Sequence, residues 1–438
     1  MVHLTILIPI NKLPYLNDAF TTQCKNICES LSKKIDLKVT WVMFPSIPPY
    51  QKSDFVSSNH EVIFFDEFCN LSNIFDIVKP HIILVNGSLD FHNVQTILIS
   101  RFRKIPIITL FFRNPYVEKL SFFSALQARF RGLTAKYDLS SKQPKLSRLF
   151  TIKFYFNQFN FLFKTLCNVE MTKIQSFMFF LKYVKITSLD VNPTHKIISG
   201  DVNLCNVEEM KNILLLHKFE NSSIFVVGDP YFDNHDLREQ KNITKNESLK
   251  PKILFCTTPN HEHGLCSKEK EFDLIINVIN TILNHDIEIA LKIHPTSSRI
   301  HEYTDALKGK ILIPITIFQS ENLTEILNDY DIMLTYGATG AIHDAVLIGK
   351  PIVNLDFDRN LTGFVAHYDE KIITHCKNIQ SLISDIKNSN KKIILQNDIE
   401  RFFQKYLGYS KIKPSITSAD IIYSLFKKTF SSNKNNQN

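Results

Sequence analysis

Short, continuous apolar runs alternate with helical patterns along most of the chain, and this alternation constrains the fold more than any other feature. In the first quarter of the chain the apolar runs lie at 4–10, 39–44, 62–65, 82–85 and 105–112. Parallel strands that are buried on both faces of a sheet have such uninterrupted runs, and helices usually connect them. The sequence therefore predicts an α/β fold of doubly wound parallel sheets, with ligand loops at the carboxyl ends of the strands.

A polar segment at 238–251 separates two series of these runs. The second series lies at 253–256, 287–293, 311–315, 331–335 and 352–357. Because 438 residues exceed what one hydrophobic core usually holds, we expect two Rossmann-like domains. We predict an N-terminal domain at 1–238, a C-terminal domain at 250–417, a terminal helix at 418–430 and a disordered tail at 431–438.

Residues 117–186 interrupt the alternation and form a basic, aromatic insertion in the first domain. This segment has 12 Lys and Arg against three acids, whereas the net charge of the whole chain is +8. It also holds 15 of the 50 aromatic residues. A helical insertion of this composition can lie on an anionic membrane surface, or it can pack its rings on the first domain and turn its cations to water. Both alternatives stay open, and nucleic acid is not expected because no recognisable binding motif accompanies the charge.

The N-terminus and the cysteines indicate a cytoplasmic protein, with the inner face of the membrane as a further location. The first apolar run, Leu4–Ile10, is too short for a secretory signal and reads as a strand. No stretch has the length of a transmembrane helix. The eight cysteines form no CxxC pair and no zinc spacing, which favours reduced thiols and no metal site.

The most informative local pattern is a small-residue turn between a strand and a short helix. The run at 331–335 breaks into Tyr-Gly-Ala-Thr-Gly at 336–340, and the helix that follows closes at Gly-Lys-Pro, 349–351. Free N–H groups and the positive end of a helix dipole suit a phosphate. We therefore predict phosphate binding by Gly337, Thr339 and Gly340, against the alternative of an ordinary turn that favours glycine.

Asp344 lies one helical turn beyond Gly340, on the same face of the predicted helix. A carboxylate at this place can accept hydrogen bonds from both hydroxyls of a ribose. The alternative is a solvated helix residue, and the sequence does not decide between the two.

Two further segments follow predicted strands of the second domain. His294 and Pro295 end one of them: the imidazole can donate to a phosphate, and the proline fixes the exit of the chain. The loop at 257–264 carries Thr258 and His263, which are candidates for contacting a nucleotide. His261 and His263 together suggest a metal, but no further ligand falls at metal spacing, so we expect none.

Three landmarks in order resemble the GT-B glycosyltransferases. They are SIFVVGDPYFD at 223–233, KIHP at 292–295, and the strand–GATG–helix–GKP unit at 331–351. The likeness covers most of 195–390 and is strongest to enzymes of bacterial and archaeal surface-polysaccharide synthesis: HisPro-motif sialyltransferase-like enzymes, capsule polysaccharide transferases and CDP-glycerol glycerophosphotransferases. It implies a GT-B-like fold, with a nucleotide-sugar donor in the second domain and an acceptor in the first.

The chain also departs from these families. The glycerophosphotransferases usually have Asp-Tyr-Ser-Ser where this chain has Thr-Tyr-Gly-Ala at 335–338, and the related sugar epimerases carry paired Glu where this chain has His343 and Asp344. The resemblance therefore leaves a CMP-, CDP- or UDP-linked sugar as co-substrate, without a metal or another cofactor.

An acid–base group is expected from the first domain, because proton transfer needs a carboxylate or an imidazole. Asp90 and His92 follow one predicted strand, and Asp201 follows another, at 197–198; Glu118 is a further candidate. Arg113, just after a strand, is a candidate for holding an anionic group. Each of these residues taken alone is more often structural.

The leading prediction is a glycosyltransferase that moves a sugar from a nucleotide donor to a glycan or lipid-linked acceptor. One alternative is a UDP-sugar epimerase of the same fold, which needs no acceptor. Another is a non-catalytic, membrane-associated partner in a glycan assembly complex. Nucleotide binding would separate the enzymes from the partner, and turnover without an acceptor would separate the epimerase from the transferase.

Overall fold

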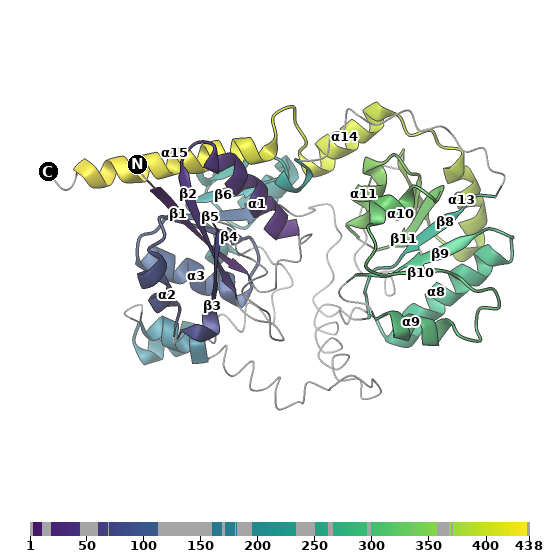
Figure 1. Ribbon diagram of the computed structural model, residues 1–438, viewed down its shortest axis with the longest axis horizontal. Helices are drawn as coiled ribbons and strands as arrows, with labels where there is room; N and C mark the ends of the chain where they lie inside the picture. The colour runs from purple at the N-terminus through teal and green to yellow at the C-terminus, as the bar shows by residue number, and fades with distance from the viewer. Residues whose placement is uncertain are drawn as a thin grey trace. The chain divides into compact units, whose positions relative to one another are not determined.

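The computed structural model places two parallel sheets, each in a compact unit of its own (Figure 1). The residues described are 3–10, 19–43, 60–68, 70–112, 160–168, 171–179, 181, 195–233, 250–261, 266–295, 299–337, 339–356, 368 and 371–435. The first unit consists of the described residues of 1–115, 146–235 and 403–438, and the second of those of 236–402. The predicted pair of Rossmann-like domains is confirmed.

The first sheet has seven described strands in the order β3-β2-β1-β4-β5-β6-β7, all parallel. Its strands are β1 (His3–Ile10), β2 (Asp36–Met43), β3 (His60–Phe64), β4 (Ile82–Asn86), β5 (Ile107–Phe111), β6 (Val202–Cys205) and β7 (Ile224–Val226). Its main helices are α1 (Ala19–Ser32), α2 (Leu71–Val78), α3 (Phe91–Phe102), α7 (Glu208–Leu216) and α15 (Pro414–Asn435). The strand order reverses between β1 and β4, so the loops after these two strands diverge there.

The second sheet has six described strands in the order β10-β9-β8-β11-β12-β13, again all parallel. Its strands are β8 (Ile253–Cys256), β9 (Ile289–Lys292), β10 (Ile317–Phe318), β11 (Ile332–Tyr336), β12 (Ile352–Leu355) and β13 (Ile373–Cys376). Its helices are α8 (Lys268–Leu283), α9 (Ile300–Leu307), α10 (Leu323–Leu327), α11 (Ala341–Leu347), α13 (Leu382–Asn390) and α14 (Gln396–Leu407), which continues into the first unit. The order reverses between β8 and β11.

One predicted strand of this sheet, at 311–315, is wrong. The edge strand β10 begins two residues later, and Leu312 is 94% exposed. Pro314 has no N–H for a sheet ladder, so an apolar run that contains it does not continue as a paired strand.

The C-terminal helix belongs to the first unit. Helix α15 begins at Pro414, four residues before the predicted start, and continues to Asn435, where we expected a disordered tail. Its Ala419, Ile422 and Phe426 join the core that α1 makes with the β1 side of the sheet, and Figure 1 shows both helices beside these strands. An amphipathic helix needs an apolar surface to cover, and this face of the first sheet supplies it.

The described parts of the basic insertion pack partly on the first unit. Phe161 is buried with its ring edge-on to Phe65, and Thr165 Oγ1 accepts a hydrogen bond from Leu71 N at 3.2 Å. Ile174 and Phe177 are exposed. Most of the insertion lies outside the described residues, so membrane contact stays a prediction.

Membrane spans and disulfides are both missing from the described part of the chain. None of its helices has the length and apolar character needed to cross a bilayer. The seven cysteines in it are unpaired, and all but Cys167 are buried.

Two glycines bring the loop after β7 against the start of the C-terminal segment. Gly228 has φ +87° and Gly408 has φ +68°. A Cβ on Gly408 would lie 1.9 Å from Asn206 O and 2.8 Å from the Cα of Gly228. Asp229 N donates to Leu407 O at 2.9 Å across the same contact. The close approach of the two backbones, and not only the backbone angle, therefore requires glycine at 408.

We predict that Gly408→Ala destabilises the first unit by roughly 3 kcal/mol or more, because left-handed strain adds to a backbone clash. Trp41, the single tryptophan, is buried in this unit, so its fluorescence in a urea titration reports the loss. Gly309→Ala is the control, since Gly309 has φ +73° in the second unit and no atom within 4 Å of an added Cβ. An unchanged Trp41 transition in Gly408→Ala would contradict the prediction.

Candidate functional site

The loops after β8 and β11 meet at the point where the second sheet reverses its strand order. Open parallel sheets bind ligands at such points. Thr258 Oγ1 donates to Tyr336 O at 2.5 Å, and the Tyr336 hydroxyl oxygen lies 3.0 Å from Thr258 O. These contacts hold the two loops together, and they place predicted Thr258 next to the turn at 337–340.

The turn after β11 has one position that requires glycine. Gly337 has φ +69°, whereas Gly340 has an ordinary helical φ of −61° and no atom of a described residue within 4 Å of an added Cβ. The described residues therefore leave space beside Gly340 that a ligand can enter. Thr339 Oγ1 accepts from Ala341 N at 3.3 Å, so its hydroxyl caps α11. Because α11 has only seven residues, an anion here would depend on individual N–H groups more than on a helix dipole.

Asp344 is partly buried in α11, and no described residue donates a hydrogen bond to its carboxylate. Burial raises its pKa to about 6. Burial raises the pKa of the Cys256 thiol in β8 to about 12. The charge of Lys292 lowers this pKa and the charge of Asp344 raises it, so Asp344 lies near this thiol. Asp344 is therefore not a solvated helix residue; it is a carboxyl group near the end of β8 to which none of the described residues donates a hydrogen bond.

The neighbouring His343 has a structural environment. Its Nε2 lies 3.2 Å from the Tyr368 hydroxyl, and its ring lies against those of Tyr368 and Phe402. Burial lowers its pKa to about 4, so the imidazole is neutral at pH 7. Of the two residues that stand where the sugar epimerases carry paired Glu, only Asp344 supplies a carboxylate.

Polar side chains form a row on one face of the second sheet, at in-register positions near its carboxyl edge. Lys292, Cys256, Thr335 and Asn354 are paired successively across β9, β8, β11 and β12. Lys292 Nζ donates to Gln319 O at 2.5 Å and Thr335 Oγ1 donates to Cys256 O at 2.9 Å. The amide of Asn354 is buried and has no partner among the described residues. This row gives the sheet a polar surface next to the switch point.

His294 and Pro295 lie one strand away from the switch point, at the end of β9. His294 is partly buried and Pro295 is exposed, with its carbonyl oxygen 3.4 Å from Gln319 Nε2. Their place at the carboxyl edge agrees with the sequence prediction, and a phosphate contact stays a prediction.

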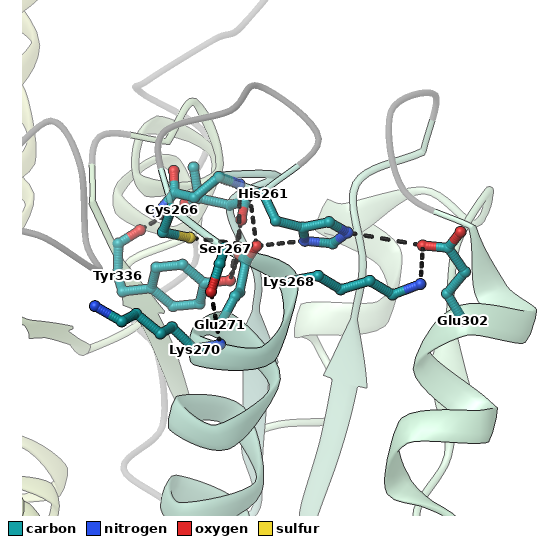
Figure 2. A network of polar contacts seen from close by, with 10 residues as sticks. His261, Cys266, Ser267, Lys268, Lys270, Glu271, Glu302 and Tyr336 are labelled. Carbon is teal, nitrogen blue, oxygen red and sulfur yellow. Dashed lines mark hydrogen bonds and ion pairs between the residues drawn. The ribbon is translucent and has the colours of Figure 1, made fainter. Parts of the chain in front are cut away.

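The residue that organises this edge, Glu271, was not singled out in the sequence. Figure 2 shows its carboxylate at the centre of a buried network. It is 0% exposed and accepts hydrogen bonds from His261 N at 2.7 Å, from Asn260 N at 3.3 Å and from the Tyr336 hydroxyl. One carboxylate of α8 thereby holds the loop after β8 and the end of β11. The sequence did contain a signal for this role, because Glu271 is a charged residue within the apolar face of the helix at 268–283.

The same network accounts for His261. Its Nδ1 lies 2.5 Å from Glu271 Oε2, and its Nε2 lies 3.7 Å from Glu302 Oε2. Lys268 Nζ lies 3.3 Å from the same Glu302 oxygen. The His261 imidazole, followed by Lys268, lowers the pKa of Glu302 to about 2. In the part of the chain that is described, no cluster of three or more His, Cys, Asp or Glu side chains is arranged to hold a metal ion.

Asp90 and His92 lie after β4, at the switch point of the first sheet. Asp90 is exposed at the start of α3, and its carboxylate accepts from Ser88 Oγ at 2.6 Å. His92 is buried; burial lowers its pKa to about 4, and the Asp90 charge opposes that shift. Asp90 is thus placed where a ligand can reach it, whereas His92 is a neutral side chain of the interior.

The third acid–base candidate, Asp201, lies at the wrong edge of the sheet. It precedes β6, and its Oδ2 accepts from Ile107 N at 2.8 Å at the start of β5. Both strands begin there, whereas ligand loops follow strand ends. Asp201 therefore accepts a hydrogen bond at the start of a strand and does not lie at the same edge of the sheet as Asp90. Arg113, Glu118 and His263 lie outside the described residues.

Comparisons with known proteins find similarity to UDP-GlcNAc 2-epimerases. A family model described as UDP-N-acetylglucosamine 2-epimerase matches residues 197–402, less than half of the chain. The Methanocaldococcus jannaschii UDP-GlcNAc 2-epimerase in complex with UDP-GlcNAc and UDP has a TM-score of 0.51 at 13% identity, over 97% of this chain and 100% of that one. The S. aureus MnaA–UDP structure has a TM-score of 0.50 at 12% identity, over 98% and 97%. No curated protein matches. At these identities the structures show a shared fold.

The predicted glycosyltransferase is contradicted by these comparisons. The matched family and the M. jannaschii structure are UDP-GlcNAc 2-epimerases, which is the alternative that the sequence had left open. The prediction was misled because the GATG turn and the HisPro strand end were assigned to the nucleotide, which both kinds of enzyme bind. They carry no information on whether the sugar is transferred or inverted.

We predict that Tyr336→Phe destabilises the second unit by about 2 kcal/mol, because it removes a donor from the buried Glu271 carboxylate. Calorimetry should show the transition of this unit lowered by about 4–8 °C. Tyr330→Phe is the matched control in the same unit, since the Tyr330 hydroxyl makes no hydrogen bond to a described residue. Equal effects of the two substitutions would contradict the role of the network.

Proposed function

We propose that the protein is a UDP-sugar epimerase that inverts one carbon of a UDP-linked N-acetylhexosamine without an acceptor. The observation that supports this most is the Asp344 carboxyl group, which lies beside the Gly337 turn at a sheet switch point and has no hydrogen-bond donor among the described residues. Such a group suits a ligand that brings hydroxyl donors next to a phosphate. We choose epimerisation over sugar transfer because the family model that matches residues 197–402 is that of an epimerase.

The nucleotide part of the substrate fits the second unit. We assign the diphosphate to the N–H groups of the turn at 337–340, where Gly340 faces open space. We assign the ribose hydroxyls to Asp344, whose carboxylate can accept two hydrogen bonds once it is ionised. Glu271 acts only indirectly, because it holds Tyr336 and the loop after β8 in place. It is a positioning residue.

UDP-N-acetylglucosamine is the substrate class that we carry over from the matched family and from the M. jannaschii structure. Inverting a sugar carbon requires a group that removes a proton and a group that returns one. We assign a role in this proton transfer to Asp90 of the first unit, because it is an exposed carboxylate after β4. The glycan acceptor expected for a transferase has no part in this reaction.

Turnover without an acceptor tests the proposal. Full-length protein in D₂O with UDP-N-acetylglucosamine alone should give, by NMR, an epimer that carries deuterium at the inverted carbon. Asp90→Asn should lower deuterium incorporation at least 100-fold, in the range expected for an acid–base group, and leave UDP binding unchanged. Asp76→Asn is the control, since Asp76 is an exposed acid of the same unit paired with Arg103.

Two outcomes would contradict this assignment. Tight UDP binding without any deuterium incorporation would identify a non-catalytic nucleotide-binding protein. Normal turnover by Asp90→Asn would show that another group moves the proton.

A further inference from the structure

A pocket lies in the first unit where α1 ends and α15 begins. It has a volume of about 310 Å³. A short connection, 33–35, joins the end of α1 to the start of β2, so the pocket is at the amino-terminal edge of the first sheet. Ligand loops of the proposed reaction follow the opposite, carboxyl edge. No residue assigned to the epimerase site lines it.

The floor of this pocket is buried and polar. Ser30 Oγ and Ser415 Oγ are 2.7 Å apart, and Ser415 N donates to Asp233 Oδ2 at 3.1 Å. Asp233 is only 8% exposed, and its Oδ1 has no hydrogen-bond partner among the described residues. A buried acceptor without a donor is costly. The floor therefore suits a ligand that brings a hydroxyl or another donor.

The rim of the pocket is mainly cationic. Lys33 and Lys413 are exposed, and neither forms an ion pair with a described residue. Lys34 lies 2.6 Å from Asp420, so its charge is already paired. Glu29 is the acid on the rim. The start of the 22-residue α15 adds the positive end of a helix dipole at Ser415. Two ammonium groups without an ion-pair partner among the described residues, together with a helix start, favour an anion.

From this arrangement we infer that the pocket binds a small phosphate ester with free hydroxyl groups, such as a sugar phosphate. Lys33 and Lys413 bind the phosphate, and a hydroxyl of the ligand donates to Asp233 Oδ1. Its volume is at the lower end of the range for small-molecule sites, which fits a monosaccharide phosphate. The site is separate from that of the UDP-sugar and goes beyond the proposed function.

Calorimetric titration of the full-length protein tests this inference, with UDP at saturation so that the nucleotide site is filled. The three probes are glucose 6-phosphate, inorganic phosphate and glucose. We expect glucose 6-phosphate to bind at least tenfold more tightly than phosphate, and glucose not to bind. The double variant Lys33→Gln, Lys413→Gln should lose at least tenfold in affinity for glucose 6-phosphate. Lys38→Gln, Lys196→Gln makes the same charge change elsewhere in this unit and should lose none.

A second variant tests the hydroxyl contact. Asp233→Asn keeps an oxygen for Ser415 N and removes the carboxylate acceptor. It should reduce the affinity for glucose 6-phosphate to that for inorganic phosphate. Equal wild-type affinities for these two probes would overturn the ligand class, and no binding of either, or full binding by the double-lysine variant, would overturn the site. Because UDP binding is measured separately, its failure would count against the proposed function alone.

Discussion

The buried carboxylate of Glu271 is the interaction on which the geometry of the second unit's functional edge depends. A carboxylate in an apolar core is costly unless donors surround it, and here the donors come from the loop after β8 and from the end of β11. The two segments therefore cannot move independently of α8. Thr258 connects the same segments a second time, because its Oγ1 donates a hydrogen bond to Tyr336 O. The result is a stiff frame around the turn that begins at Gly337.

Within this frame, some polar side chains of the site have no hydrogen-bond partner among the described residues. Asp344 has no described hydrogen-bond donor, and the buried amide of Asn354 has no described partner. Burial raises the pKa of Asp344 to about 6, so folding favours its protonated form. Its contribution to the free energy of unfolding is therefore largest below about pH 4 and decreases as the pH rises through 6. A ligand with hydroxyl groups would relieve this cost, which links binding to the ionisation of one carboxyl group.

The sequence predicted the elements that depend on local pattern. Strands such as β1, β4, β8 and β11 are buried on both faces, so their apolar runs were visible, and the Gly337 turn followed from the break after 335. Contacts between distant residues were not predictable in the same way. Glu271 and Tyr336 are 65 residues apart, and α15 finds its core partners in α1 near the other end of the chain. Asp201 looked like a loop acid because the sequence did not show at which edge of the sheet it lies. The predicted reaction was wrong because the recognisable motifs were those expected to bind a nucleotide, and no motif in the sequence was specific to the sugar.

The most direct test of the account is the pH dependence of UDP binding, measured by calorimetry from pH 5 to 8 for the wild type and for Asp344→Asn. If the ribose donates to Asp344, binding lowers the pKa of that carboxyl group. Affinity should then rise with pH and level off above about pH 7, with proton release near pH 6. Asp344→Asn should bind about tenfold more weakly at pH 7.5 and lose the pH dependence, since a charge-assisted hydrogen bond is worth about 1.5–3 kcal/mol. The same affinity and pH profile in both proteins would show that the nucleotide does not bind at Asp344.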